Sequence, residues 1–312
     1  MIFLLQYFAK RLVSIILVLW VVASATFLLM HTIPGGPFTT EKVLPEAVLK
    51  NIEARYKLND PLWQQYVDYM GNLLRWDLGP SFKYEGETVN NIINRSFPIS
   101  GQLGLYAILL ALVVGIPAGI VSALKQNEWP DNLAMFGATI GFSVPSFIMA
   151  SLLMFVFALK LRWFPAAMWG TPQQAVLPTL ALASLPTAFF ARLVRSSMLE
   201  VMNQDYIRTA KAKGLPGNTV IWRHAIKNAI MPVVTYLGPL TAGIMTGSFV
   251  VERIFAIPGL GQHFVTSIYN RDYTAILGIT VFYSILLVLF NFIVDVAYAF
   301  IDPRIKYVEE KE

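Results

Sequence analysis

A basic segment at residues 200–231, EVMNQDYIRTAKAKGLPGNTVIWRHAIKNAIM, interrupts an otherwise apolar part of the chain. Its cationic side chains, which outnumber Glu200 and Asp205, are Arg208, Lys211, Lys213, Arg223 and Lys227. Arg208 and Lys211 are three residues apart and would share one face of a helix, where they could meet acidic groups of a partner. The segment could equally be a solvated loop whose charge only reflects the excess of lysine and arginine on the cytoplasmic side of membranes.

Two short helices separated by a turn are predicted inside this segment. Tyr206, Ile207 and Ala210 recur at helical spacing in the first helix. One side of the second would be lined by Val220, Ile221, His224, Ala225 and Asn228. Between them, the stretch from Gly214 to Gly217 breaks the helix, because glycine can take a positive φ and Pro216 cannot continue a helix. A small helical hairpin of this kind, held outside an apolar body, is well shaped to be gripped by another protein.

Other residues that could do chemistry are few. Asp295 lies near the end of the last apolar stretch, and we expect it to form a structural ion pair with Arg192 or Arg195, because an unpaired charge at membrane depth is costly. The three histidines are scattered over different loops and the chain has no cysteine, so we expect neither a metal site nor another cofactor. There is no phosphate-binding GxxxxGK[ST] loop and no hydrolase grouping, so we expect no enzyme activity.

The composition is that of a membrane protein. Of the 312 residues, 56% are hydrophobic and 14% are charged, whereas soluble domains carry about 25% charged residues. The net charge of +5 is explained by insertion into a bilayer, which needs cations on the cytoplasmic side, so we expect lipid and not nucleic acid as a partner.

Six apolar stretches are long enough to cross a bilayer, which predicts an all-α polytopic protein. The first helix occupies residues 1–30, and because its apolar character continues past Ala23-Ser-Ala25 we expect it to be retained and not cleaved as a signal peptide. A polar external segment follows at residues 31–98. The core, residues 99–301, holds the other spans at about 101–124, 133–159, 175–194, 233–251 and 276–301, and residues 302–312 form a tail.

The distribution of lysine and arginine predicts the orientation. If the N-terminus is cytoplasmic, six spans place residues 200–231 and the C-terminal tail on the cytoplasmic side as well. When the long first loop is left out of the count, most of the lysines and arginines then also lie on the cytoplasmic side, as the positive-inside rule requires. The external segment is rich in aromatic residues, namely Trp63, Tyr66, Tyr69, Trp76, Phe82 and Tyr84. They could contact a docking protein or anchor the segment at the membrane interface, and both alternatives stay open.

The order of residues in the basic segment resembles the EAA loop of type I ABC importer permeases. Ala210 and Gly214 fall in register with that motif, while Arg208 and Thr209 replace its acidic residue and first alanine, and Ile230-Met-Pro232 comes later than in the family. This variant looks like the oligopeptide/dipeptide branch. In that family the loop is the helix that couples to the ATPase subunit, which implies coupling roles for Tyr206, Arg208, Thr209, Ala210, Lys211, Ala212, Lys213 and Gly214. Ala210 would have to stay small for close packing there.

Further stretches strengthen the resemblance, which covers the whole chain. Within the family, the chain looks most like the oligopeptide permease subunit that occupies the first-permease position. Residues 248–261 resemble the segment after the fifth span. We expect Glu252, Pro258, Gly259 and Gly261 to lie at an external gate or a binding-protein contact, where Pro258-Gly-Leu-Gly261 forms a tight turn. Gly35-Gly-Pro-Phe38 and Asp302-Pro-Arg-Ile305 resemble the start of the first external loop and the C-terminal ending.

The resemblance implies a type I ABC importer permease fold with a large external loop after the first helix, in the cytoplasmic membrane of a prokaryote. It also implies four kinds of partner: a homologous second permease, two cytoplasmic ATPase subunits, an extracytoplasmic peptide-binding protein and the peptide itself, which would cross by alternating access. A permease for dipeptides, nickel, haem or a sugar remains an alternative. So do a non-transporting membrane scaffold and a carrier driven by an ion gradient.

Overall fold

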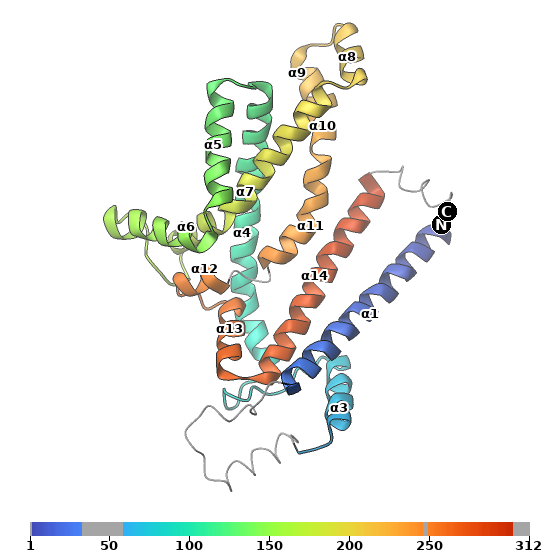
Figure 1. Ribbon diagram of the computed structural model, residues 1–312, viewed down its shortest axis with the longest axis vertical. Coiled ribbons are helices and arrows are strands. Elements are labelled where there is room, and N and C mark those ends of the chain that lie inside the picture. Colours follow the sequence, from blue (N-terminus) through green and yellow to red (C-terminus); the bar gives the residue numbers. More distant parts are fainter. Residues whose placement is uncertain (1, 33–58, 246–248, 302–312) are drawn as a thin grey trace. The chain divides into compact units, whose positions relative to one another are not determined.

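The computed structural model describes residues 2–32, 59–245 and 249–301, with the side chains of all of these except 2–10, 295 and 297–301 (Figure 1). Within the described residues the chain is helical, apart from loops and one isolated antiparallel bridge between Pro80 and Thr88. The chain divides into two compact units, residues 1–99 with 259–288 and residues 100–258 with 289–312. Each unit has its own core.

The first unit contains α1 (Ile2–Thr32), α3 (Leu62–Leu74), the start of α4 (Val89–Leu124), α13 (Leu260–Asn270) and the first part of α14 (Tyr273–Ile301). Its core is formed by Leu78, Val89, Ile92, Ile93, Leu260, Ala275 and Ile279. Gly278 lies so close to this core that an added Cβ would be 2.7 Å from Cγ1 of Val89. The helices can approach this closely because position 278 has no side chain.

The loop before α4 is held by a buried carboxylate. Asp272, which is fully buried, accepts hydrogen bonds from the hydroxyl of Ser81 and, at 3.1 Å, from the backbone N–H of Phe82. The same carboxylate accepts a bond from the backbone N–H of Ala275 at 3.2 Å, at the start of α14. Because these donors satisfy the buried charge, the loop and the helix start are fixed to each other.

The second unit carries the rest of α4, the end of α14 and the helices between them (Figure 1). These are α5 (Trp129–Ser143), α6 (Ser146–Leu153), η1 (Met154–Lys160), α7 (Pro172–Met202), α8 (Asp205–Ala212), α9 (Gly217–Thr219), η2 (Val220–Ala225), α10 (Ile226–Ala229), α11 (Met231–Met245) and α12 (Phe249–Ile254). The central helix is α7, since α5, α6, α10 and α11 all pack on it. It begins with a capping box formed by Thr171 and Gln174.

Close packing of α4 on α7 depends on small residues. A Cβ added to Gly119 would lie 2.6 Å from the carbonyl oxygen of Ala191 and 2.7 Å from Cβ of Val194. Neither backbone could move away without displacing a whole helix, so this position tolerates only glycine. Gly119 therefore acts as a contact point between α4 and α7.

The expected span at 133–159 is broken. Only together are α5 and the α6–η1 helix long and apolar enough to cross a membrane, and the two are bent by 108° between Ser143 and Ser146. The break falls at Val144, which is extended (φ −93°, ψ 116°), and at Pro145, which caps α6. Proline disfavours the helical conformation in the residue before it, which explains the position of the break.

Four single helices in the described ranges, α1, α4, α7 and α14, are long and apolar enough to cross a membrane, and the bent pair adds a fifth candidate span. The sixth candidate, Met231–Ile254, takes in α11 and α12 and runs across residues that the structure does not describe. These helices contain the expected spans but are longer at their ends: α4 already begins at Val89, inside the segment expected to be external, and α7 runs from Pro172 to Met202. The stretches Gly35–Phe38 and Asp302–Ile305, which carried part of the resemblance, lie outside the described residues.

Candidate functional site

The basic segment folds as two helical pieces joined by a sharp turn, as the sequence predicts. Helix α8 ends at Ala212, and Gly214 follows with a φ of +73°. The backbone N–H of Gly214 donates to the carbonyl of Lys211 at 2.9 Å, and that of Leu215 donates to Ala210 at 3.4 Å. This pair of bonds is a Schellman motif, in which a left-handed residue closes the helix. The prediction of a positive φ at Gly214 is confirmed.

One face of α8 is buried against its own chain. Ile207 is fully buried and Ala210 is 6% exposed, in the same core cluster as Val194 and Met198 of α7. Ala210 must therefore be small because it packs against residues of its own chain. The expected close packing of Ala210 against a partner stays a prediction. The helix is seated on the last turns of α7 by ordinary apolar packing.

The opposite face of α8 is exposed and carries charge. Arg208, Thr209, Lys211, Ala212 and Lys213 are all exposed, and Tyr206 is 41% exposed. Arg208 lies 3.5 Å from Asp205, but both side chains are largely in solvent, so this ion pair contributes little to stability. The side chain of Arg208 is therefore available to a partner.

The second piece, α9, η2 and α10, packs beside α8. Its Val220, Ala225 and Ala229 are buried in the same cluster. Asn228 donates a hydrogen bond from Nδ2 to the hydroxyl of Tyr206 at 2.8 Å, which ties the two pieces together. Trp222 is 69% exposed, so the segment presents an aromatic side chain as well as cations.

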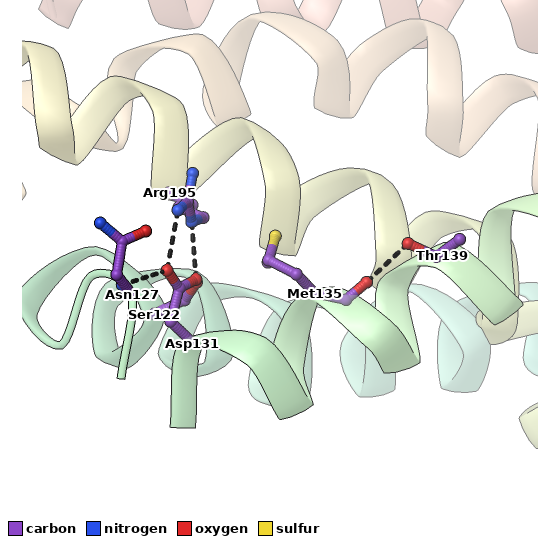
Figure 2. A network of polar contacts seen from close by, with 6 residues as sticks. All are labelled: Ser122, Asn127, Asp131, Met135, Thr139 and Arg195. Atoms are coloured by element: carbon purple, nitrogen blue, oxygen red, sulfur yellow. Dashed lines mark hydrogen bonds and ion pairs between the residues drawn. The ribbon is translucent and has the colours of Figure 1, made fainter. Parts of the chain in front are cut away.

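A buried ion pair that was not predicted from the sequence joins α7 to the start of α5 (Figure 2). Asp131, 2% exposed at the start of α5, accepts hydrogen bonds from Nε of Arg195 at 2.7 Å and from Nη2 at 2.8 Å. It also accepts bonds from the hydroxyl of Ser122 and, at 2.9 Å, from the backbone N–H of Asn127. The carboxylate thus joins the end of α4, the α4–α5 turn and α7, with every donor at hydrogen-bonding distance.

The arginines expected to pair with Asp295 have other contacts. Arg195 uses two nitrogens on Asp131, and Arg192 donates to Oγ1 of Thr139 at 2.9 Å and lies 5.3 Å from the ring of Phe142. The side chain of Asp295 is outside the described residues, so its own partner stays a prediction. Asp131 was missed because it lies between two apolar stretches, where an acid after Trp129-Pro130 is typical of any helix start.

The segment after α12 differs in part from the expected external turn. Glu252 is fully buried and accepts a hydrogen bond from the hydroxyl of Ser100 at 2.8 Å, so its carboxylate is an internal contact. The sharp turn falls at Ala256, with a φ of +50°, because the N–H of Ile257 bonds back to the carbonyl of Glu252 at 2.8 Å. Pro258 is exposed, Gly259 is the N-cap of α13 and Gly261 is buried inside that helix. A role of this segment as a gate stays a prediction.

No group of histidine, cysteine or acidic side chains in the described part of the chain is arranged to hold a metal ion. The exposed cations of α8 can bind an acidic surface. The geometry is suited to binding and to transmitting movement along α7.

Comparison with known proteins gives matches along the whole chain. Residues 115–307 match the family described as "Binding-protein-dependent transport system inner membrane component", and residues 4–104 match the N-terminal region of the same kind of membrane component. The chain is 51% identical to the dipeptide transport system permease protein of Bacillus subtilis, over 96% of this chain and 98% of the relative. It is 46% identical to the oligopeptide transport system permease protein of Salmonella typhimurium, over 97% of this chain and all of the relative.

The fold is similar to that of solved importers. A methionine ABC transporter in an inward-facing conformation superposes with a TM-score of 0.58 at 16% identity, covering 68% of this chain and 96% of the other. An amino acid ABC transporter gives a TM-score of 0.51 at 16% identity, covering 66% and 92%. At this identity the likeness supports the fold, which is the type I importer fold expected from the sequence.

Proposed function

Because this chain belongs to the family of binding-protein-dependent transport system inner membrane components, we propose that it is a permease subunit of an importer that moves peptides inward. The relatives that cover nearly the whole chain carry both dipeptide and oligopeptide transport in their names. Short peptides are therefore the substrate class, with oligopeptides as the main proposal and dipeptides as the alternative. ATP is hydrolysed on separate subunits.

The observation that carries the proposal is that α8 packs on α7 with one face and exposes the other. Its inner face, with Ile207 and Ala210, is buried against the end of α7, and its outer face exposes Arg208 and Lys211. A rigid element with one face fixed to a membrane-spanning helix and one charged face free can receive a force from a partner. We assign α8 and the turn at Gly214 to contact with a cytoplasmic ATPase subunit.

Movement of α8 would pass directly into the span. Val194 and Met198 of α7 pack in the same cluster as Ile207 and Ala210, so α8 and the end of α7 move together. Arg195, which lies between Val194 and Met198 on α7, forms an ion pair with Asp131 of α5. Asp131 also accepts a hydrogen bond from Ser122 of α4, so α4 and α5 are joined to the same part of α7. A tilt imposed on α8 is thereby shared by several spans, which is the kind of motion that alternating access needs.

The remaining partners and the orientation follow from the same proposal. The chain is a multi-pass inner-membrane protein, with the basic segment and both termini on the cytoplasmic side. A homologous second permease completes the path, two ATPase subunits bind inside, and an extracytoplasmic binding protein delivers the peptide. The excess of lysine and arginine in the basic segment supports this orientation.

The proposal is tested by charge reversal on α8. The variant Arg208→Glu should retain less ATPase subunit on the purified permease, with a deficit that depends on ionic strength because exposed charges are screened by salt. Peptide uptake into proteoliposomes should fall with it. The matched control is Lys125→Glu, which reverses another exposed cation outside α8 and should leave both quantities unchanged.

The two alternatives from other classes predict different results. A scaffold would retain the ATPase but give no ATP-dependent peptide uptake in proteoliposomes. A carrier driven by an ion gradient would take up substrate without any nucleotide-binding subunit and would be insensitive to Arg208→Glu. Wild-type uptake and wild-type retention in Arg208→Glu would reduce α8 to a solvated basic turn.

A further inference from the structure

Helix α3, which lies between the first two spans in sequence, has an apolar surface that is only half covered. At 100° per residue its apolar side chains form one continuous arc, and its polar residues Gln64, Asp68 and Asn72 lie on the other side. One half of the arc carries Tyr66, Tyr69 and Leu73, which are all partly buried. The adjacent half carries large apolar side chains in solvent: Trp63 is 68% exposed, Val67 57% and Leu74 90%.

The covered half of α3 packs on the last turns of α1. The hydroxyl groups of Ser24 and Tyr66 are 2.7 Å apart. The ring of Phe27 stacks on Tyr69 at 5.6 Å and meets Tyr66 edge-on at 5.5 Å. Burial raises the pKa of Tyr69 to about 12, which fits a contact that excludes water.

These contacts fix the depth of α3 relative to the membrane. The candidate span of α1 runs from Arg11 to Thr32, a rise of about 33 Å at 1.5 Å per residue, close to the ~30 Å of a hydrocarbon core. Ser24 and Phe27 belong to the last three turns of this span. A helix that touches them lies at the boundary between hydrocarbon and water and not far out in solution.

The end of α1 beside this contact also exposes large apolar side chains. Next to Phe27 on α1, Leu28 and Leu29 are 59% and 62% exposed, as expected for side chains of a span in contact with acyl chains. A tryptophan at one end of the exposed stripe is typical of membrane interfaces, where the ring spans the apolar and polar zones. An apolar stripe beside a polar face is what a helix lying in the interface plane requires.

We propose that α3 is an interfacial helix that lies on the membrane at the C-terminal end of the α1 span, with Trp63, Val67 and Leu74 among the lipids. For Trp63, the proposal favours lipid over a docking protein, the two alternatives that the sequence left open. The inference does not depend on the substrate or on the ATPase contact. In the orientation proposed above the leaflet is the outer one.

The test uses the absence of native cysteine. Single cysteines at Val67 on the exposed stripe and at Gln64 on the polar face are labelled with a polarity-sensitive fluorophore, in the full-length chain reconstituted with its co-purified subunits. Emission is compared in phosphatidylcholine vesicles with and without lipids that carry a nitroxide high on the acyl chain. The label at 67 should be blue-shifted and should lose emission to the nitroxide, while the label at 64 should keep its emission.

A second pair guards against a local defect of one variant. Leu74→Cys should behave as Val67→Cys does, and Asn72→Cys as Gln64→Cys does, since Asn72 is exposed on the polar face. Equal emission with and without nitroxide lipid at both 67 and 74 would overturn the proposal. So would protection of these positions only after an extracytoplasmic binding protein is added, because the stripe would then be a protein-docking surface.

Discussion

Arg195 and Asp131, 64 residues apart in sequence, form a two-point ion pair, Nε to Oδ1 at 2.7 Å and Nη2 to Oδ2 at 2.8 Å. The side chain of Asp131 is 3% exposed and that of Arg195 is 25% exposed. The planar fork of arginine allows both bonds at once, so the pair fixes the rotation of α7 as well as its distance from α5. Arg195 follows Val194 in sequence, and Val194 packs in the same core cluster as Ile207 and Ala210 of α8. The start of α5 and the basic segment are thus both fixed to the last turns of α7.

Replacing Asp131 by asparagine should destabilise the protein strongly. The change leaves Arg195 without a counter-charge in a mostly buried position, and breaking a buried pair in this way costs about 3–5 kcal/mol. Since Arg195 keeps some contact with solvent, we expect the lower end of that range. The measurement is the apparent unfolding temperature of the purified protein in detergent, together with the yield of monodisperse material.

Two control variants separate the pair from general effects. Ser122→Ala removes a single hydroxyl donor to the same carboxylate and should cost about 1 kcal/mol. Asp205→Asn changes an acid whose side chain is 97% exposed and should have no measurable effect. An unfolding temperature of Asp131→Asn equal to that of Asp205→Asn would show that the pair does not hold α7.

Much of the fold could be predicted because hydropathy depends on local sequence. The apolar runs at 101–124 and 175–194 lie inside α4 and α7. The 108° bend after Ser143 could not be predicted, although Pro145 marks the place of the interruption. A proline fixes where a helix is interrupted, but the new direction depends on packing of α6 against α7, which lies later in the chain.

The site shows the same division between local and distant information. The positive φ of Gly214 could be predicted because a glycine before Leu215-Pro216 is a local signal for a helix end. The neighbours of Ala210 could not be predicted, because the core that buries it includes residues of α7, and local sequence does not show which helix α8 packs against. Asp131 and Arg195 are too far apart in sequence for their pairing to be predicted from residue spacing. Asp295 was expected to be the partner of Arg195 because it lies inside an apolar stretch, where an unpaired charge is costly.

Enlarging Ala210 should loosen the seat of α8. Ala210 is 6% exposed in a packed cluster, and inserting extra methylene groups in such a place typically costs about 1–3 kcal/mol. We therefore expect Ala210→Leu to lower the unfolding temperature of the purified permease. Ala212→Leu is the matched control, because it makes the same change two residues away on the exposed face. Equal stability of the two variants would contradict the seating of α8 on α7.

The orientation can be tested at the two ends of α7. Gln173 and Asn203 are separated by 30 residues of helix, about 45 Å at 1.5 Å per residue, which is enough to reach both sides of a bilayer. In intact cells an impermeant maleimide should label a single cysteine at 173 and should reach one at 203 only after permeabilisation. The reverse pattern would put the basic segment outside and remove the proposed ATPase contact.

The turn at Gly214 should tolerate substitutions in the order of their ability to take a left-handed conformation. A Cβ at this position has no atom within 4 Å, so the φ of +73° is the constraint and not packing within the chain. Asparagine should be tolerated best. Alanine should cost about 1–2 kcal/mol in this conformation, and β-branched valine more. If the turn transmits force, peptide uptake per ATP hydrolysed should fall in the same order, while insertion into the membrane is unchanged.

The matched control for this series is Gly217→Ala. Gly217 is three residues away, begins α9 without a positive φ and also has nothing within 4 Å of an added Cβ. Alanine there should leave uptake and ATP hydrolysis at wild-type levels. If Gly214→Val matched Gly217→Ala in both quantities, the left-handed turn would be dispensable for coupling. If instead Gly214→Asn were as defective as Gly214→Val, the loss would come from a collision with the partner's surface, because asparagine keeps the turn but not the open space.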